Sequence, residues 1–598
     1  MYKKVKNRIT EASIVIIDSG LECSIQKDKN IKGGICFYQD NSGQIIEQEN
    51  YDDVFGHGTA IFNIVNNNCG GATYYFIKIF DDTPICNQAL LIHALEYVYK
   101  YIKCDFILLS SGTAMLRNIG EFENITKKLY DNNSIIVSAF NNQGALSYPA
   151  AGDYVIGVDS TPNISPKESH YIIKGSPVNI LCSQRSYRVT WLNGNKLIQK
   201  GNSYSAAYVV SKLFCALKQT KSKNRDVLLQ YIKNDSNEIS FDPPCFNQIL
   251  NPDFLSSRDR MRAIAFPFSK EIKALAANED LLQVDIVDYY DVRASGKIGL
   301  MISDILGYGD NTKKIKCIDG INPEGNYDLI ICGHLDLLNN ITNYDWNKRL
   351  KEIAHRGSKY LYFFDYDADR TLNNIYSPPL IQKYEGYSLG KLWQVGAPVL
   401  GVFGTSSIQG KFSLQLKLRK ALLNDGYSVR QISTEPTGAL FGMDFVCPIG
   451  YKSTIKLAGN DAAKFYNQLI HECDKYGPDL ILVGCQSATI PHNCYNEQYF
   501  TFQQIEFLFG TNPDAVVLVI NEFDDVDYIK RTIKFIESAI STKVISCVIS
   551  PVINVNLTND VTLDYRSLSN ILKMPVFDYN TQFDLLYKSV LDYFGGAE

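Results

Sequence analysis

The sequence lacks the features that mark membrane-spanning, secreted and zinc-binding proteins. No window approaches the roughly 20 consecutive apolar residues of a transmembrane helix. The apolar run nearest the N-terminus, residues 14–17, is too short for a signal peptide. The 15 cysteines include no Cys-x-x-Cys pair, so neither a zinc site nor a disulfide framework is indicated. We therefore expect a cytoplasmic protein with reduced thiols and no metal site.

The chain also lacks a strong excess of charge of either sign. Its 59 Lys and Arg residues against 64 Asp and Glu residues give a formal net charge of −5. Nucleic acids and anionic membranes recruit strongly basic surfaces, so we expect neither as a partner. No internal repeat or low-complexity segment interrupts the sequence. Its 598 residues suggest roughly three or four domains.

Short apolar runs alternate with stretches of helical length along residues 1–235. Continuous apolar runs separated by helices are typical of a buried parallel sheet in an α/β fold. The runs are 12–18, 74–80, 105–111, 134–140 and 154–160. We therefore predict a parallel α/β domain over residues 1–235. A linker over 236–259 is expected to follow it, because Asn, Asp, Ser and Pro are frequent there.

The same alternation returns twice after the linker. The first set of apolar runs is 262–269, 284–290, 328–334 and 360–367. It predicts a smaller Rossmann-like α/β domain over residues 260–395. The second set is 397–404, 429–434, 479–485, 515–521 and 543–550. It predicts a third α/β domain over residues 396–598.

Three residues of different chemistry stand at element ends in the first domain. Asp18 ends an apolar run, His57 lies between two glycines, and Ser203 stands at the start of a predicted helix. Such a set can perform acyl transfer: the His takes the Ser proton, and the Asp fixes the His tautomer and stabilises the imidazolium. Taken singly, Asp18 is more typical of a strand-end turn and Ser203 of a helix cap, with Ser205 as another candidate cap. Their order and setting together favour the triad.

The motifs around these residues resemble those of subtilisin-like serine peptidases (subtilases). The motifs are D-S-G at 18–20, G-H-G-T at 56–59, Tyr-Pro-Ala at 148–150 and G-x-S at 201–203. The order Asp, His, Ser is that of the family. The resemblance spans roughly residues 10–235 and implies that Asp18, His57 and Ser203 are the catalytic residues. The family also has Thr and Pro at two nearby positions where this chain has Asn202 and Ala207.

The resemblance implies roles for further residues. Asn141 would donate its side-chain amide to the developing oxyanion. Phe140 stands where the family usually has Gly, so Asn142 is the alternative donor. The segment "LLSSG" at 108–112 resembles the edge strand that pairs with the substrate backbone. The residues that would contact the substrate are Ser110, Ser111 and Gly112.

The position of Asp18 bears on how such a peptidase would be controlled. Secreted subtilases carry a signal peptide and a prodomain before the catalytic Asp. Asp18 lies so near Met1 that neither would fit. We therefore expect an intracellular subtilase that folds without a prodomain.

A glycine-rich loop opens the third domain. Residues 404–411 read G-T-S-S-I-Q-G-K between a predicted strand and a predicted helix. Loop amides and a helix N-terminus can hold phosphate groups, and Lys411 would reach the terminal ones. The loop resembles that of dethiobiotin-synthetase-like P-loop proteins. The residues predicted to bind a nucleotide, ATP or GTP with Mg²⁺, are Gly404, Thr405, Gly410, Lys411, Ser413 and Glu435.

The loop departs from the strict pattern G-x-x-x-x-G-K-[ST]. Phe412 follows the lysine, so Ser413 is the candidate for the hydroxyl that binds Mg²⁺. Cys485 ends the run at 479–485, where an acidic residue would hold the metal. Nucleotide hydrolysis is therefore not predicted. The N-x-x-D pattern at 521–524 echoes a base-reading motif, and chance explains it equally well.

Together these features predict a cytoplasmic serine endopeptidase that cleaves a specific peptide and needs no cofactor for proteolysis. The C-terminal half resembles clostridial peptide maturation system proteins, which implies a ribosomally made precursor peptide as substrate, its leader as the part removed, and other maturation enzymes as partners. Two alternatives stay open. One is a catalytically degenerate scaffold that binds a peptide. The other is a nucleotide-dependent enzyme whose chemistry lies in the P-loop half.

Overall fold

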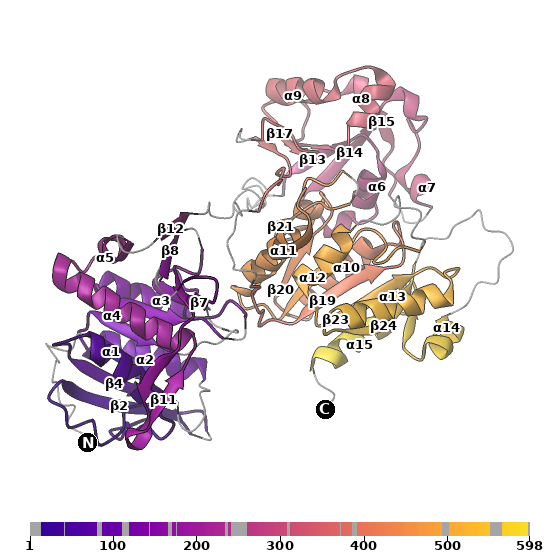
Figure 1. Cartoon of the computed structure of the whole chain (residues 1–598). Helices are drawn as coiled ribbons and strands as arrows, with labels where there is room; N and C mark the ends of the chain where they lie inside the picture. The colour runs from indigo at the N-terminus through magenta and orange to yellow at the C-terminus, as the bar shows by residue number, and fades with distance from the viewer. Residues whose placement is uncertain are drawn as a thin grey trace. The chain divides into compact units, whose positions relative to one another are not determined.

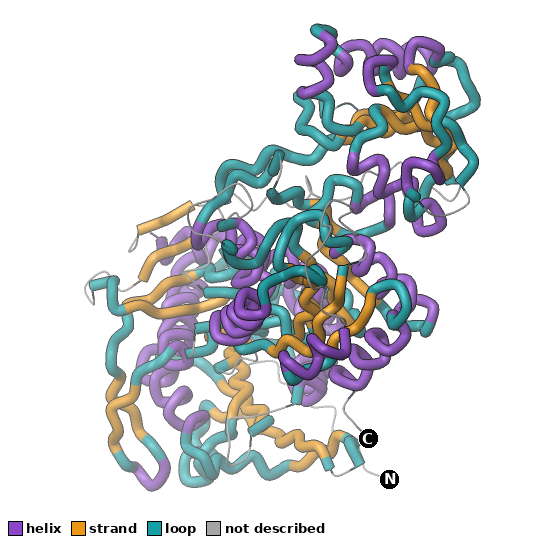
Figure 2. The backbone as a smooth tube through the Cα atoms, turned by 90° about the vertical axis from the view of Figure 1, so that its right-hand side faces the viewer, coloured by secondary structure: helices purple, strands orange, loops and turns teal. Residues whose placement is uncertain are grey.

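The chain forms two compact units, each built from sheets with helices against their faces (Figures 1 and 2). The first unit contains Met1–Pro244, Glu385–Gly396 and Lys475–Gly477, and the second contains Cys245–Tyr384, Ala397–Asp474 and Pro478–Glu598. The computed structural model describes residues 14–40, 42–80, 87–110, 116, 119–142, 144–165, 170–174, 176–233, 237–240, 260–307, 311–370, 372, 374–384, 391–450, 452–492, 502–550 and 565–595.

Within the described residues, a ten-stranded sheet forms the centre of the first unit. Its strand order is β12-β8-β9-β7-β6-β5-β1-β4-β2-β3, and all neighbours from β7 to β2 are parallel. The strands are β1 (Ile14–Asp18), β2 (Ile31–Gln39), β3 (Ile45–Gln48), β4 (Tyr74–Lys78), β5 (Phe106–Leu109), β6 (Ile135–Ala139), β7 (Val155–Thr161), β8 (His170–Lys174), β9 (Ile180–Ser183) and β12 (Asn237–Ser240). The five apolar runs form β1, β4, β5, β6 and β7, so the predicted parallel α/β sheet is confirmed.

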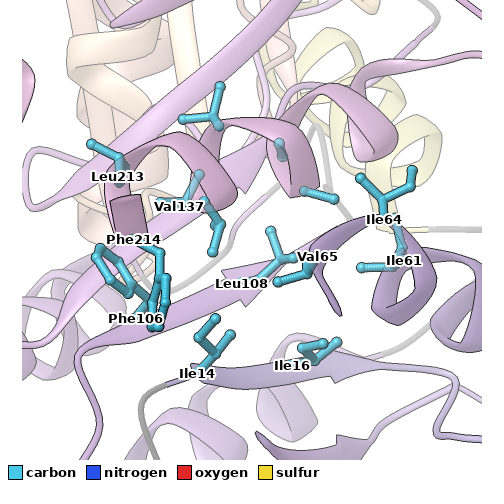
Figure 3. Packing of buried hydrophobic residues seen from close by; sticks show 14 of the residues in the cluster. Ile14, Ile16, Ile61, Ile64, Val65, Phe106, Leu108, Val137, Leu213 and Phe214 are labelled. Atoms are coloured by element: carbon cyan, nitrogen blue, oxygen red, sulfur yellow. The ribbon is translucent and has the colours of Figure 1, made fainter. Parts of the chain in front are cut away.

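Both faces of this sheet are buried under helices. Successive residues of a strand point to opposite faces, so Ile14 and Ile16 enter one core and Val15 and Ile17 the other. The first core is shared with α1 (His57–Asn68) and α4 (Asn202–Thr220), the second with α2 (Gln88–Tyr101) and α3 (Ile119–Asp131). Figure 3 shows side chains of α1 and α4 gathered over the strands; they are Ile61, Ile64, Val65, Leu213 and Phe214.

Two smaller features complete the described part of the first unit. A hairpin of β10 (Tyr187–Thr190) and β11 (Lys196–Gln199) precedes α4, and α5 (Arg225–Lys233) follows it. Strand β12 lies in the segment that we assigned to a linker. It pairs with β8 in parallel, and Glu238 on it forms ion pairs with Lys174 at 3.3 Å and with Lys233 at 3.0 Å.

A six-stranded, all-parallel sheet follows in the second unit. Its order is β15-β14-β13-β16-β17-β18, which is the Rossmann order. Strands β14 and β15 lie on one side of β13 and the last three strands on the other, so the switch point of the sheet lies between β13 and β16. The strands are β13 (Arg262–Phe266), β14 (Asp285–Asp291), β15 (Ile315–Cys317), β16 (Leu329–Cys332), β17 (Tyr360–Phe363) and β18 (Ile375–Tyr376). The helices are α6 (Lys270–Ala276), α7 (Ile302–Leu306), α8 (Asp336–Thr342) and α9 (Trp346–Gly357).

A seven-stranded parallel sheet forms the rest of the second unit. Its order is β21-β20-β22-β19-β23-β24-β25. The strands are β19 (Val399–Gly404), β20 (Val429–Ser433), β21 (Phe445–Val446), β22 (Leu480–Gly484), β23 (Ala515–Ile520), β24 (Lys543–Ile549) and β25 (Val576–Asp578). The helices are α10 (Lys411–Asn424), α11 (Gly459–Asp474), α12 (Gln503–Thr511), α13 (Val526–Ala539), α14 (Tyr565–Leu572) and α15 (Phe583–Gly595).

The two sheets of the second unit share one hydrophobic core. Tyr362 and Phe364, from the six-stranded part, belong to the same buried cluster as Leu416 of α10 and Phe441. The Tyr362 hydroxyl donates to the Pro436 carbonyl oxygen at 2.6 Å. The Rossmann-like part and the P-loop part therefore pack as one body. No helix in the described ranges is both long and apolar enough to cross a bilayer.

The core of the first unit predicts the effect of truncating one of its isoleucines. Ile61 is fully buried between α1 and the sheet, so Ile61→Ala should lower the free energy of unfolding by about 2–5 kcal/mol. Ile198, which is 75% exposed on β11, provides the matched control, and Ile198→Ala should change it by less than about 0.5 kcal/mol. Urea unfolding of the full chain, followed by circular dichroism, measures both. Equal losses would contradict the assignment of this core.

Candidate functional site

Asp18 is placed by the sheet. It is the last residue of β1, whose neighbours on either side are β4 and β5, so its carboxylate lies at the carboxyl edge of a parallel sheet, where functional groups collect. The carboxylate is buried and accepts a hydrogen bond from the backbone N–H of Ser19 at 2.7 Å. A buried carboxylate needs such donors because desolvation is costly.

His57 is the first residue of α1, and a buried carboxylate holds the helix start in place. One oxygen of Asp53 accepts from the backbone N–H of Gly56 at 2.7 Å, and the other accepts from the N–H and the hydroxyl of Thr59 at 2.8 and 2.7 Å. A side chain at Gly58 would place Cβ only 2.3 Å from the Gly20 carbonyl oxygen. Glycine at this position therefore lets α1 approach the end of β1 closely.

Asp18 and His57 are in direct contact. The His57 Nδ1 atom lies 2.9 and 3.0 Å from the two Asp18 carboxylate oxygens. An ionised carboxylate only accepts hydrogen bonds, so Nδ1 carries the proton and Nε2 of the neutral ring is the basic nitrogen. The pair thus has the arrangement in which an Asp fixes the tautomer of a His that acts as a general base.

Burial and pairing act in opposite directions on the pKa values of the two groups. Burial alone would raise the pKa of Asp18, but the neighbouring His57, the Ser110 side chain and the Ser19 N–H bring it below its ordinary value. Burial alone would lower the pKa of His57, but the Asp18 carboxylate, with a smaller effect of Asp53, raises it above 6.5. The electrostatic pairing therefore outweighs desolvation for both groups.

Ser203 lies beside this pair without touching the histidine. It is the second residue of α4, whose N-cap position is Gly201, so Ser203 is not the helix cap. Its hydroxyl donates to the Ser110 carbonyl oxygen at 2.8 Å. Ser110 follows Leu109, which pairs with Ile17 in β1, about 4.8 Å away. Within the described part of the chain, no hydrogen bond joins Ser203 to His57.

Two aromatic side chains, Tyr204 and Phe55, lie close to the His57 ring. The Tyr204 ring centroid lies 5.7 Å from that of His57, and the Phe55 ring lies 6.4 Å away. Trp191, from the turn between β10 and β11, is 6.4 Å from Phe55. The indole packs directly on Gly56, where an added Cβ would lie 2.3 Å from its ring nitrogen. Trp191 of this turn therefore lies against Phe55 and Gly56, the two residues before His57.

The residues predicted to stabilise an oxyanion lie in the loop after β6. The Asn141 backbone N–H donates to the Ser147 hydroxyl at 2.9 Å. The Asn142 side-chain oxygen, the alternative in the sequence analysis, accepts the backbone N–H of Asn202 at 2.9 Å. Asn142 therefore links this loop to the residue before Ser203.

The interpretation of 108–112 as an edge strand is wrong for the strand itself. Strand β5 lies between β6 and β1 in the sheet, and its backbone groups pair with both neighbours. Only residues beyond Leu109 can offer backbone groups to another chain. Ser110 is the first of these and is buried, whereas Ser111 and Gly112 lie outside the described residues.

Asn202, which departs from the family pattern, has all its polar groups occupied. Its side-chain nitrogen donates to the Phe140 carbonyl oxygen at 3.0 Å and to Asp159 at 2.7 Å, and its side-chain oxygen accepts from the Ser160 hydroxyl at 2.6 Å. The sequence analysis missed Asp159, whose only local signal was a buried strand containing a carboxylate.

In the second unit, the predicted phosphate loop connects β19 to α10. Gly404 ends β19, Gly410 is the N-cap of α10 with φ of 76°, and Lys411 is its first residue. Lys411 is 4% exposed and donates to the Ser406 carbonyl oxygen. No carboxylate among the described residues forms an ion pair with it. Burial lowers its pKa, although Cys485 and Glu435 act in the opposite direction.

Polar side chains that the P-loop consensus does not specify form hydrogen bonds with this loop. Gln409 accepts from the backbone N–H of Ser406 at 2.9 Å and donates to the Thr405 hydroxyl at 2.7 Å. Asn521 donates to the Ser406 hydroxyl at 3.2 Å, and Asp524 is hydrogen-bonded to the Thr405 hydroxyl. The N-x-x-D pattern at 521–524 therefore braces the loop.

Glu435 lies near several charges from both sheets of the second unit. Burial, with the neighbouring Glu271, raises its pKa to about 7, against the charges of Lys270, Lys411 and His334. The His334 Nδ1 atom is 2.6 Å from Asp365.

Ser413 is partly exposed in the first turn of α10. The loop fits a phosphate group through Lys411, but Cys485 takes the place of a metal-binding acid after β22.

Comparisons with known proteins agree with the P-loop. Residues 387–582 match the family described as "Domain of unknown function (DUF1611_C) P-loop domain", so the predicted P-loop domain is confirmed. Among solved structures, the chain is similar to a cold-adapted subtilisin-like serine proteinase, with 13% identity, a TM-score of 0.31, and coverage of 37% of this chain and 81% of that one. None of the curated proteins compared with the sequence matches it.

The Asp18–His57 contact predicts a change in the titration of His57. Since the carboxylate raises the pKa of His57 against the effect of burial, Asp18→Asn should bring that pKa below its ordinary value. NMR titration of labelled histidine measures it, with His57→Gln to assign one resonance among the seven histidines. Asp40→Asn, at a half-buried residue directly after β2, is the control and should leave the titration unchanged. An unchanged pKa in Asp18→Asn would refute the pairing.

Proposed function

We propose that the first unit is a serine endopeptidase of the subtilase kind, with Asp18, His57 and Ser203 as its catalytic residues. The observation that carries the proposal is the buried Asp18–His57 pair at the end of β1. The Ser203 hydroxyl is hydrogen-bonded to Ser110, the residue after the adjacent strand β5. The motifs D-S-G, G-H-G-T and G-x-S in this order support the same reading.

The proposed reaction is acyl transfer to Ser203. His57 Nε2 removes the hydroxyl proton while Oγ attacks the carbonyl carbon of the scissile peptide bond. The protonated His57, stabilised by Asp18, then gives its proton to the leaving amine as the C–N bond breaks. Water hydrolyses the acyl-enzyme by the same steps and restores Ser203. In this proposal the Asn141 side chain donates to the oxyanion.

The first step requires the Ser203 hydroxyl to change partner. It donates to the Ser110 carbonyl oxygen, and this hydrogen bond must break before the hydroxyl can donate to His57. Catalytic hydrogen bonds are often incomplete without substrate and tighten in the Michaelis complex. A substrate that pairs with the backbone after Leu109 would compete for this region and release the hydroxyl.

The proposed substrate is an extended peptide, most specifically the leader of a ribosomally made precursor peptide, processed in the cytoplasm alongside other maturation enzymes. The resemblance of the C-terminal half to peptide maturation system proteins motivates this substrate. Phe55 and Trp191 beside His57 favour a substrate with an apolar side chain near the cleaved bond.

A second candidate function is the binding of a nucleotide by the P-loop domain. The specific observation in its favour is Lys411, a buried ammonium group that donates to a carbonyl oxygen and forms no ion pair with a carboxylate in the described chain. A terminal phosphate would supply the missing counter-charge. With bound Mg²⁺, the Ser413 hydroxyl and the Glu435 carboxylate are the proposed contacts of the metal.

The triad predicts selective acylation of Ser203. A fluorophosphonate probe should label the full-length protein, and Ser203→Ala should abolish the labelling, as read by intact-protein mass spectrometry. Asn141→Ala should slow it by about 10²–10³-fold because one oxyanion donor is lost. Ser205→Ala, two residues along the same helix with its hydroxyl near the Gly201 carbonyl, is the matched control and should label normally. A wild-type protein that resists the probe, with or without peptide and ATP, would rule out the peptidase.

The phosphate loop predicts nucleotide binding that is independent of the triad. Lys411→Ala should lower the affinity for ATP or GTP at least tenfold, because the charge–phosphate contact is lost. Isothermal titration calorimetry of the full chain measures it. Lys420→Ala is the control: it removes a cation from the same helix, paired with Asp280 at the surface. If Lys411→Ala binds as well as the wild type, the loop is not a nucleotide site.

A further inference from the structure

A short segment from the C-terminal half of the sequence belongs to the first unit. The chain leaves the second unit after Tyr384 and returns to it at Ala397, just before β19. Between these points, residues 391–396 are described and lie with the first unit. We call residues 391–396 the strap.

Lys391 of the strap neutralises the buried Asp159 carboxylate. The ammonium nitrogen is 2.7 Å from one carboxylate oxygen, and the two side chains are 16% and 3% exposed. The other oxygen accepts the Asn202 side-chain N–H at 2.7 Å. Asp159 therefore joins Lys391 to the residue immediately before Ser203.

The Lys391–Asp159–Asn202 chain also reaches the loop that carries Asn141. The Asn202 side chain donates to the Phe140 carbonyl oxygen at 3.0 Å, one residue before Asn141. Its backbone N–H donates to the Asn142 side chain, one residue after it. Asn202 thus links the first turn of α4, which contains Ser203, to the proposed oxyanion loop.

Trp393 holds the far end of the same loop. The backbone N–H of Leu146 donates to the Leu392 carbonyl oxygen at 3.1 Å, and Leu146 and Trp393 form a parallel bridge. The Trp393 ring packs 5.8 Å from the Tyr148 ring and against a buried cluster that contains Phe140, Leu146 and Ala150. The strap therefore contacts the loop at both of its ends.

Loss of the Lys391 side chain would be energetically costly. Removing one partner of a buried ion pair leaves an uncompensated charge in a region of low dielectric constant. Without Lys391, the Asp159 carboxylate would have to gain water or a proton. Either change would alter the acceptor that orients Asn202, and with it the start of α4.

We propose that Lys391 and Trp393 are positioning residues of the peptidase: the strap aligns Ser203 with the Asn141 loop, so that the site is complete only when this segment of the C-terminal half is in place. This inference rests on the proposed function for its catalytic consequence. Its structural consequence, the ordering of residues 140–150 and 201–204 by the strap, holds independently of catalysis.

Kinetics of labelling by a fluorophosphonate separate positioning from folding. In full-length Lys391→Met, the limiting acylation rate should fall by about 10–100-fold, since small displacements of a nucleophile have effects of that size. The fraction of protein finally labelled and the concentration giving half the limiting rate should stay unchanged. A purely structural role would lower the labelled fraction instead. Lys391→Arg should retain most of the rate, and Lys383→Met, at an exposed lysine before the strap, should match the wild type.

Hydrogen exchange measured by mass spectrometry tests the inference without relying on catalysis. In Lys391→Met and Trp393→Ala, peptides covering residues 140–150 and 201–204 should exchange at least about tenfold faster, whereas peptides from β13 and β16 should not change. If wild-type protein is not labelled, the proposed function fails and exchange alone decides the inference. Wild-type exchange in both regions, or a wild-type acylation rate in Lys391→Met, would overturn it.

Discussion

The burial of the Asp18 carboxylate is the constraint around which the first unit is arranged. A negative charge at the end of a buried strand is stable only if donors reach it, and the His57 ring, the Ser110 side chain and the Ser19 N–H do so. His57 can reach it only because α1 begins against the end of β1, which requires glycine at position 58 and the Asp53 carboxylate at the helix start. The geometry that stabilises the Asp18 carboxylate is the same geometry that places the proton of His57 on Nδ1 and leaves Nε2 as the basic nitrogen.

Buried charges elsewhere follow the same rule with different partners. Asp159 is neutralised by Lys391, and in consequence a distant part of the sequence is tied to the turn before Ser203. Lys411 is the exception, because it is buried against a carbonyl oxygen and has no carboxylate as a partner within the described chain. A buried ammonium group that donates to a carbonyl oxygen and forms no ion pair among the described residues is the feature on which the proposed nucleotide site rests.

Much of the architecture could be predicted because fully buried parallel strands are continuous apolar runs, and every such run became a strand. The Asp18–His57 contact was predictable from the order of the D-S-G and G-H-G-T motifs and not from the apolar runs, because His57 begins a helix. The short strands β8, β10, β11 and β12 were not, because they are partly exposed and carry polar residues such as Glu238. Strand β9 is buried but has only four residues. The order of strands in the sheet cannot be read from the residues of a single strand, so the sequence did not show that β5 lies between β6 and β1. Asp159 with Lys391, and Gln409 within its loop, could not be foreseen because no local pattern records a pairing between residues far apart in the sequence or a side chain folded back on its own loop.

The strap also sets the order of events during synthesis. A ribosome that has completed residues 1–244 has made every strand of the ten-stranded sheet, yet it has not reached Lys391 or Trp393. Until translation passes Gly396, Asp159 lacks its cation and the apolar cluster around Phe140 lacks its tryptophan. Under the proposed function, the site of a nascent chain would therefore stay incomplete until the strap has been made, and its alignment would follow the synthesis of residues 391–396.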